Sequence, residues 1–233
     1  MKMLLHGTAV ALLVLAATHT VQASSPNPDQ VIGVLSKAVL DVTHKPSGQD
    51  WATATRGQAL SQGHTLRTGE KSVAIVKFKD NSLLRLRELS EVTLSGSQSG
   101  QSLSKSVDLL NGVIGFSVSK QRAGEEFRFS TPTSVASIRG TGGSLSKGAT
   151  DVLVVVEGVV NFLNRVSGKA VDVQAGFTGV SWPDGKLDVR VSTEAERASA
   201  LEAARSGDQP RQLKLEIRNG QGEQKDLIID YKE

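Results

Sequence analysis

The 233-residue chain contains no cysteine, so neither a disulfide nor a lipid-modified cysteine anchor can form. Aromatic residues make up only 4% of the sequence, which leaves Val, Leu, Ile and Ala to fill the core. That composition favours thin, closely stacked β layers over a core built from large rings. Aromatic platforms for stacking against sugars are not expected.

Neither sign of charge dominates, because 27 Lys and Arg residues face 24 Asp and Glu residues, a formal net charge of +3. This balance does not predict a nucleic-acid partner. Histidine is scarce, and beyond the first 30 residues only His44 and His64 occur, without the paired spacing of a metal site. We therefore predict no metal and no cofactor.

Long hydrophobic runs are absent except near the N-terminus. Residues Met1–Ala23 carry Lys2, an apolar stretch at Ala9–Ala17 and a small-residue site before Ser24, the three regions of a secretory signal peptide. The apolar stretch is shorter than the roughly twenty residues of a transmembrane helix. We expect a periplasmic or secreted chain with no transmembrane helix after cleavage.

Turn residues alternate with short apolar segments along the rest of the chain, which is typical of an all-β protein. The segments predicted as strands are Val31–Val42, Val73–Lys79, Leu83–Arg87, Glu91–Leu94, Ser106–Leu110, Val113–Val118, Phe127–Ser130, Thr133–Ile138, Asp151–Val156, Val159–Leu163 and Ala170–Gln174. Two strand-turn-strand segments align on Gly112 and Gly158, which suggests a repeat. These features predict a solenoid-like stack of short β-strands or a β-sandwich.

The chain divides into four predicted parts. They are a signal peptide at 1–23, a Pro-containing tether at 24–30, a β domain at 31–191, and a C-terminal extension at 192–233. Ser192-Thr193-Glu194 is typical of a helix start, and the helical spacing of apolar residues continues to Gly207. Alternating residues on both sides of Asn219-Gly220 then predict a terminal β-hairpin, which could cover an open edge.

No catalytic constellation emerges from the sequence, so we expect no enzyme. Three Ser-x-x-Lys matches lack the helix and the companion motifs of serine–lysine acyl enzymes. The glycine spacing at Gly143–Gly148 lacks the Lys and Ser/Thr of a phosphate loop. Glu125-Glu126 lacks an identifiable partner carboxylate for glycoside hydrolysis.

A basic ribbon is the best candidate for ligand binding. If the apolar residues of the hairpin at 73–87 face inward, then Lys77, Lys79, Arg85 and Arg87 project from its opposite face, and Arg67 extends the ribbon. Such a ribbon suits peptidoglycan carboxylates, anionic polysaccharide, lipid head groups or an acidic protein loop. The alternative is an ordinary solvated face.

The run from Phe127 to Phe162 combines extended segments with sharp turns and leads to a family resemblance. Five ordered blocks resemble the FecR domain family: Leu66–Ser72, Phe78–Leu86, Ser130–Pro132, Ile138–Thr141 and Val156–Val160. Together they cover about residues 63–180. The motif residues with an expected structural role are Thr68, Gly69, Asp80, Asn81, Ser82, Thr131, Pro132, Arg139, Gly140, Thr141 and Gly158.

Two of these positions carry specific expectations. Asn81 stands where the family usually has glycine, and asparagine is the best substitute for glycine in a left-handed turn. Arg139 lies in a small, apolar block. Its guanidinium could bind a ligand, or it could tie neighbouring turns together through backbone carbonyls or a carboxylate.

The resemblance implies a non-catalytic periplasmic binding or scaffolding module that recruits an envelope protein through its sheet edges or the basic ribbon. Sensors of this family receive a signal from an outer-membrane receptor and pass it through a membrane helix to a sigma factor. The alternatives are binding of peptidoglycan or anionic polysaccharide through the basic ribbon, and an enzyme that acts on envelope polymers.

Overall fold

The computed structural model describes residues 31–99, 102–205, 211–218 and 224–231. The predicted signal peptide and tether at 1–30 and the predicted turn at Asn219-Gly220 lie outside these ranges. The elements are β1 (Val31–Val39), β2 (Val42–Lys45), β3 (Ala52–Thr53), β4 (Ala59–Ser61), β5 (Thr65–Thr68), β6 (Val73–Phe78), β7 (Leu83–Leu86), β8 (Glu91–Ser99), β9 (Ser102–Ser117), β10 (Phe127–Ser130), β11 (Ser134–Ile138), β12 (Gly142–Lys147), β13 (Asp151–Glu157), β14 (Val159–Asn164), β15 (Ala170–Gln174), β16 (Phe177–Ser181), β17 (Leu187–Val191), α1 (Glu194–Arg205), β18 (Arg211–Arg218) and β19 (Gln224–Tyr231).

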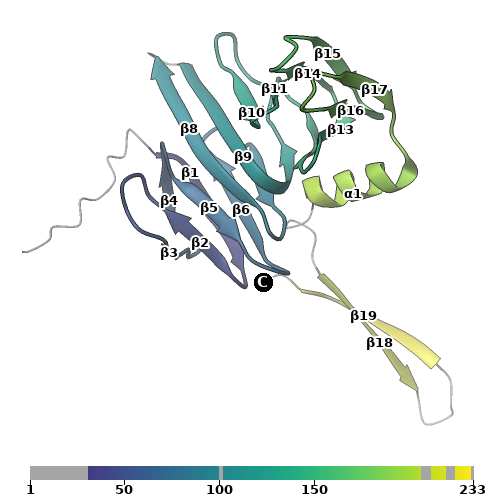
Figure 1. Cartoon of the computed structure of the whole chain (residues 1–233). Helices are drawn as coiled ribbons and strands as arrows, with labels where there is room; N and C mark the ends of the chain where they lie inside the picture. The colour runs from purple at the N-terminus through teal and green to yellow at the C-terminus, as the bar shows by residue number, and fades with distance from the viewer. Residues whose placement is uncertain (1–30, 100–101, 206–210, 219–223, 232–233) are drawn as a thin grey trace, which may run out of the picture.

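Strands β1 to β17 form one open, 17-stranded hydrogen-bonded network that is arranged in two layers (Figure 1). Sheet A runs β4-β1-β6-β7-β9-β12-β13-β16-β17. Sheet B runs β3-β2-β5-β8-β9-β10-β11-β14-β15. Strand β9 belongs to both sheets, so the layers are continuous through it. The mainly β fold class is confirmed, and the open two-layered sheet corresponds to the sandwich alternative and not to a solenoid.

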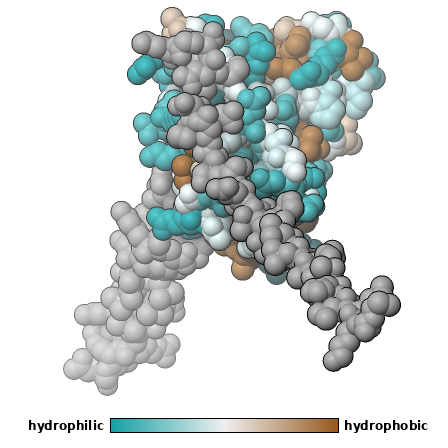
Figure 2. Space-filling model, turned by 90° about the vertical axis from the view of Figure 1, so that its left-hand side faces the viewer, coloured by the Kyte–Doolittle hydropathy of each residue, from teal (hydrophilic) through white to brown (hydrophobic). Residues whose placement is uncertain are grey.

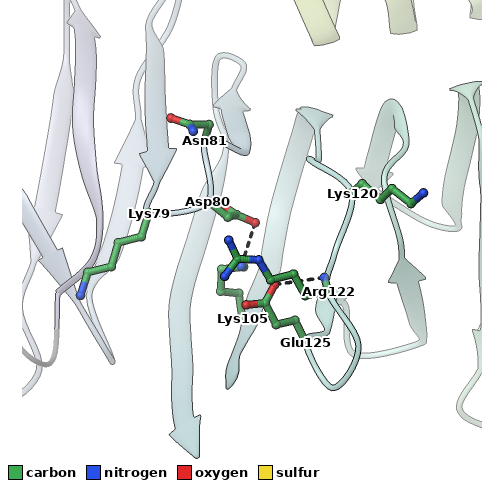
Figure 3. Close-up of a pocket in the computed structure, with 7 residues that line it drawn as sticks. All are labelled: Lys79, Asp80, Asn81, Lys105, Lys120, Arg122 and Glu125. Atoms are coloured by element: carbon green, nitrogen blue, oxygen red, sulfur yellow. Dashed lines mark hydrogen bonds and ion pairs between the residues drawn. The ribbon is translucent and has the colours of Figure 1, made fainter. Parts of the chain in front are cut away.

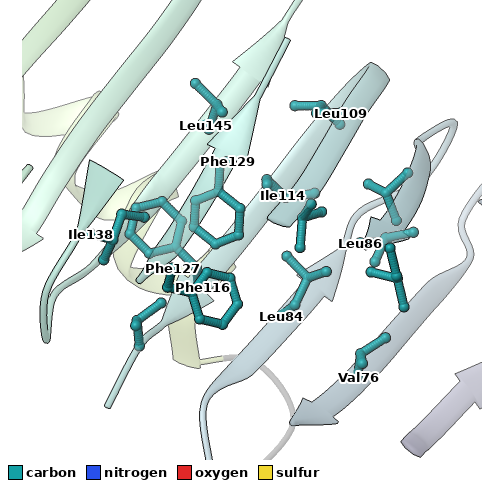
Figure 4. Close-up of a cluster of buried hydrophobic side chains, with 14 of the residues drawn as sticks. Val76, Leu84, Leu86, Leu109, Ile114, Phe116, Phe127, Phe129, Ile138 and Leu145 are labelled. Atoms are coloured by element: carbon teal, nitrogen blue, oxygen red, sulfur yellow. The ribbon is translucent and has the colours of Figure 1, made fainter. Parts of the chain in front are cut away.

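The core lies between the two layers and is mostly aliphatic, with five buried phenylalanines (Figure 4). Phe78 of sheet A meets Phe127 of sheet B edge-on, with ring centroids 5.0 Å apart. Phe116 of sheet A meets Phe129 of sheet B at 4.8 Å. These pairs lock the layers together, as expected for aromatic contacts within a β-sandwich.

Gly112 and Gly158 lie at two of the places where the chain passes from one layer to the other. The sequence predicts a turn at Gly112, but β9 is continuous there: its first part pairs with β8 and β10 in sheet B, and its last part pairs with β7 and β12 in sheet A. Both glycines have φ in the left-handed region, at 93° and 80°. The repeat seen in the sequence is therefore a repeated change of layer, made possible by the absence of a Cβ.

The helix α1 lies on the outer face of sheet A and packs against β9, β12, β13 and β7. Its start is a capping box, because Thr193 Oγ1 accepts a hydrogen bond from Glu196 N (3.2 Å) and Glu196 Oε2 accepts one from Thr193 N (2.8 Å). The helix approaches closely at Gly115, where an added Cβ would lie 2.1 Å from Ala203 O. The predicted helix start is confirmed.

The strand predictions hold for most of the β domain, with clear omissions. Val31–Val42 is split into β1 and β2 at Leu40, whose φ is 60°. The predicted list lacks β3, β4, β5, β12, β16 and β17. Figure 1 shows the terminal hairpin β18–β19 extending away from the sandwich, so the described residues do not support the prediction that it covers an open edge. None of the described helical structure is long and apolar enough to span a membrane.

Candidate functional site

A hollow of about 320 Å³ opens between the β6–β7 turn and the loop that joins β9 to β10 (Figure 3). We call it the ionic hollow, because six of its seven lining residues are charged. They are Lys79, Asp80, Asn81, Lys105, Lys120, Arg122 and Glu125. The β6–β7 turn also belongs to one of the blocks on which the sequence resemblance rests, Phe78–Leu86.

Asp80 organises the floor of the ionic hollow. Its Oδ1 accepts a hydrogen bond from Ser82 N (3.1 Å), and its Oδ2 accepts bonds from Ser82 Oγ (2.8 Å) and Gln121 Nε2 (2.8 Å). Asn81 adopts φ of 65°, which confirms the left-handed turn expected from the sequence. Burial raises the pKa of Asp80, but the hydrogen bonds from Gln121, Lys105 and Ser82 outweigh burial and hold the pKa below its usual value.

Lys105 reaches Asp80 from β9 and completes this anchor. Its Nζ lies 2.8 Å from Asp80 Oδ2, and the lysine side chain is only 1% exposed. The ammonium also lies 5.5 Å from the centre of the Phe127 ring. Sequence reasoning missed this residue, although Lys105 shares strand parity with Val107 and Leu109, which are fully buried.

The remaining cations give the ionic hollow a surplus of positive charge. Lys79, Lys120 and Arg122 are exposed, and within the described ranges no ion pair joins any of them to a carboxylate. Glu125 is the second acid, and its Oε2 accepts a bond from Arg122 N at 3.2 Å. In Figure 3 Lys79 and Lys120 project to opposite sides. An anionic group entering the hollow would therefore meet uncompensated positive charge.

The predicted basic ribbon does not exist as one surface. The expected inward residues of β6 and β7 are buried, and Lys77 and Lys79 are exposed as predicted. Arg85, however, is only 3% exposed and its Nη1 donates to Ala203 O of α1 at 2.7 Å. Arg87 pairs with Glu202 of α1 at 2.7 Å. The expectation that Arg85 is open to ligand is wrong, because α1 covers it, whereas Arg87 is 35% exposed and is engaged by Glu202 of the same helix.

Arg67 is also separate from the ribbon, because β5 belongs to sheet B. Its Nη2 lies 2.8 Å from Glu91 Oε2. Its guanidinium carbon stands 4.3 Å from the centre of the Trp51 ring. Arg67 is thus occupied by a cross-strand ion pair and a cation–π contact, and these do not involve the ionic hollow.

The first family block shapes a turn next to β8. Thr68 Oγ1 accepts a hydrogen bond from Ser90 N at 3.0 Å and donates to Arg87 O. Gly69 N donates to Asp41 O at 2.9 Å, and a Cβ at Gly69 would lie 2.5 Å from Asp41 Oδ2. These contacts give Thr68 and Gly69 a structural role.

The Thr131-Pro132 block surrounds a buried carboxylate. Asp151 is fully buried, and its Oδ2 accepts hydrogen bonds from Thr131 Oγ1 and from Ser134 Oγ, the latter at 2.7 Å. Lys147 Nζ lies 3.7 Å from Asp151 Oδ1. Thr131 Oγ1 also accepts from Ser134 N at 2.8 Å, so this network closes the turn between β10 and β11.

Arg139 does not tie neighbouring turns together. Its side chain is exposed, and among the contacts of the described residues it makes no hydrogen bond or ion pair. The connection is made instead by its neighbours: a Cβ at Gly158 would lie 2.3 Å from Thr141 Cγ2 and 2.9 Å from Gly140 O. The two family blocks therefore meet through close backbone packing and not through the arginine.

Groups suited to metal binding or acid catalysis do not assemble in the described part of the chain. No cluster of three or more His, Cys, Asp or Glu residues capable of holding a metal ion occurs there. Glu125 shares the ionic hollow with Asp80, but the lowered pKa and the Lys105 ion pair make Asp80 a poor proton donor. The hollow is suited to binding.

The two-layered fold carries a concave site, the ionic hollow, whose lining has more basic than acidic side chains. Residues 64–161 match the family described as FecR protein. The match covers less than half of the chain, and over these residues it confirms the resemblance drawn from the sequence blocks. No curated protein matches the chain.

Two crystal structures of a protein from Parabacteroides distasonis, described as a candidate anti-sigma factor, are similar to this chain. One has a TM-score of 0.50 at 12% identity and covers 63% of this chain and 67% of the other. The second has a TM-score of 0.47 at 11% identity and covers 55% and 59%. The chain thus spans less than two thirds of one of these neighbours, and at such identity the likeness concerns the fold alone.

Proposed function

We propose that this chain is a non-catalytic, signalling-related FecR module of the bacterial envelope that recruits another envelope protein by binding an acidic segment in the ionic hollow. The observation that carries the proposal is the unpaired positive charge of Lys79, Lys120 and Arg122 around one concave site. The FecR domain supports the class of function. The expected signal peptide supports a periplasmic or secreted location.

The floor of the ionic hollow is held by hydrogen bonds and an ion pair, whereas the cations at its rim are exposed. In the Asp80–Lys105 pair the lysine is buried and the aspartate is partly buried, and several hydrogen bonds fix the carboxylate. The three surrounding cations are exposed, and long flexible side chains can close on a carboxylate that enters. A pre-formed floor with mobile charged walls suits a protein segment carrying Asp or Glu.

The sharpest test is crosslinking in living cells followed by affinity capture of the tagged protein, with bound proteins and bound muropeptides analysed together. The test variant reverses the rim by Lys79→Glu, Lys120→Glu and Arg122→Glu. The matched control reverses three exposed cations outside the hollow, Arg56→Glu, Lys169→Glu and Lys186→Glu. An envelope protein lost only with the rim variant is the expected result, and equal retention by both variants contradicts the proposal.

Binding of peptidoglycan or anionic polysaccharide is a second candidate, favoured by the exposure of Lys77 on β6 and of Lys79 in the turn that follows it. Muropeptides captured by the unaltered protein, and lost with Lys77→Glu combined with Lys79→Glu, would support it. Retention that does not weaken with added salt would count against it, because exposed charge–charge contacts are screened.

A further inference from the structure

The two ends of the sandwich differ in the length of their edge strands. One end has the short edge strands β3, with 2 residues, and β4, with 3 residues. The other end has the edge strands β15 and β17, with 5 residues each. Figure 2 views the molecule from the side of the short strands, and the coloured part of that surface is mainly hydrophilic. Short edges resist pairing with another chain, whereas longer edges permit it.

Strand β17 presents free backbone groups from alternate residues. Ser192 N donates to Gly176 O at 2.9 Å, and Trp182 N donates to Lys186 O at 2.9 Å, which fixes the phase of the β16–β17 ladder. In that phase Leu187, Val189 and Val191 direct their N–H and C=O groups away from β16. The helix α1 packs mainly on β9, β12, β13 and β7 of sheet A, and the described residues place no further strand beside β17.

Apolar side chains accompany this edge. Val191 is 65% exposed and its cross-strand partner Phe177 is 36% exposed. Leu187 and Val189 are partly buried against the core. The apolar residues between the two sheets at β17 are thus incompletely buried, and an added strand would cover them.

From these features we propose that β17 pairs antiparallel with β17 of a second copy of this chain, about a two-fold axis at Val189. The sequence Leu187-Asp188-Val189-Arg190-Val191 is self-complementary in this register. Val189 lies opposite Val189, Leu187 opposite Val191, and Asp188 opposite Arg190. Opposite charges across a strand pair stabilise it, and the apolar residues cover the mouth from both sides.

The register also satisfies the backbone. Leu187, Val189 and Val191 direct their N–H and C=O groups outward, and in this register they face one another. Of these groups, Val191 O already accepts a hydrogen bond of 3.4 Å from Arg190 Nη1, a long contact that the strand pairing would replace. Each facing pair can exchange two hydrogen bonds, as hydrogen-bonded pairs do in an antiparallel sheet. Sheet A would continue from one copy into the other without a bulge.

The other long edge strand provides the contrast that selects β17. Pairing β15 with itself about its central residue places Asp172 opposite Asp172, and like charges directly opposite are destabilising. By the same ladder argument, Ala175 N bonds to Gly158 O, so Asp172 is one of the residues with free backbone groups. Only β17 of the two long edges is self-complementary. This inference is independent of the proposed function.

The first test uses the absence of cysteine from the chain. Val189→Cys places one thiol at the two-fold axis, where hydrogen-bonded residues have Cα atoms about 5.5 Å apart, within the disulfide range. Asp172→Cys is the matched control at the centre of β15. Mild oxidation is expected to link the Val189→Cys protein into dimers and to leave the control monomeric. Equal linkage of both variants, or of neither, overturns the proposal.

The second test measures self-association by sedimentation equilibrium over a concentration series. Asp188→Lys places a cation opposite Arg190 twice in each dimer and is expected to weaken dimerisation about tenfold. Asp172→Lys makes the same charge change on β15 and is expected to leave dimerisation unchanged. Circular dichroism confirms that both variants fold. A protein that stays monomeric up to about 1 mM, or a dimer equally sensitive to both changes, overturns the proposal.

Discussion

The two strands of the β6–β7 hairpin carry the same kinds of outward cations and use them differently. Lys77 and Lys79 of the first strand and its turn remain exposed. Arg85 and Arg87, on and just beyond the second strand, are taken up by α1, through Ala203 O and Glu202. Strand alternation decides which face a side chain occupies, but what covers that face is decided by a segment more than a hundred residues further along the chain.

The arginine under the helix has a clear physical role. Ala203 lies in the last turn of α1, where carbonyl groups lack intrahelical partners and the helix dipole is negative. At the other end of α1, Arg190 pairs with Glu196 at 2.6 Å. The helix is therefore clamped by arginines of sheet A at both ends. Among the described residues, Lys77 of β6 makes no hydrogen bond or ion pair with α1.

The largest expected effect comes from filling the space beneath the helix. Gly115→Ala puts a Cβ 2.1 Å from Ala203 O, so α1 must shift. We expect the free energy of unfolding to fall by about 1–3 kcal/mol and α1 to lose hydrogen-exchange protection. Urea denaturation and exchange measurements check both. Gly148→Ala is the control, because its nearest neighbour is a backbone oxygen at 3.8 Å, and equal losses in both variants would show that the helix seat is not the cause.

The next prediction compares the stability contributions of Arg85, on β7, and Lys77, on β6. Arg85→Met leaves Ala203 O without its donor and should cost about 1–3 kcal/mol of unfolding free energy. Lys77→Met should change that free energy by no more than about 0.5 kcal/mol. Chemical denaturation of the two variants side by side is the measurement. Similar losses of unfolding free energy in the two variants would show that contact with α1 does not set the contribution of these cations.

The ion pair between Arg190 and Glu196, at the start of α1, should be lost in acid. Hydrogen bonds from Arg190 lower the pKa of Glu196 to about 2, from the ordinary value of 4.5. Because the folded-state pKa is the lower one, the clamp stabilises the protein fully above about pH 4.5 and is lost as pH falls toward 2.

The test compares unfolding free energy against pH for the unaltered protein and Glu196→Gln. Other carboxylates titrate in both proteins, so the difference between the two curves isolates Glu196. That difference should shrink steadily below pH 4.5. A difference independent of pH would mean that the ion pair does not hold the helix.

The smallest effect concerns the arginine whose partner is exposed. Arg87 and Glu202 have side-chain exposures of 35% and 63%, so solvent screens their ion pair. Arg87→Ala should cost at most about 1 kcal/mol, and added salt should reduce even that. Denaturation at low and high salt measures it. A loss as large as that of Arg85→Met would show that depth beneath the helix does not set the contribution.

Several parts of the molecule followed from local pattern. The bounds of β10 and β15 match the predicted strands, because Phe127 and Phe129 alternate with polar residues and turn residues delimit both segments. The left-handed turn at Asn81 and the helix start at Thr193 also followed, since both depend on a few adjacent residues. The order of family blocks identified the FecR domain for the same reason.

Local sequence patterns predicted only part of the ionic hollow. Lys79 and Asp80 were singled out in the sequence, but Lys105, Lys120 and Arg122 join them from a separate stretch of chain. Lys105 is brought to Asp80 because β9 crosses between the two sheets. The sequence indicates a turn at Gly112, but not that the two parts of β9 join different sheets. The strands β12, β16 and β17 were missed because Gly, Ser and Asp residues weaken their strand pattern.

By itself, the sequence determined the β class, the turns, the helix cap and the family, because each depends on short-range periodicity, backbone preference or ordered motifs. Only the tertiary structure decided that two arginines serve a helix, that a lysine and an aspartate meet inside the ionic hollow, and that β17 ends a sheet. These depend on which distant segments pack together, and that choice is governed by burial and hydrogen bonding over the whole chain, beyond any local pattern.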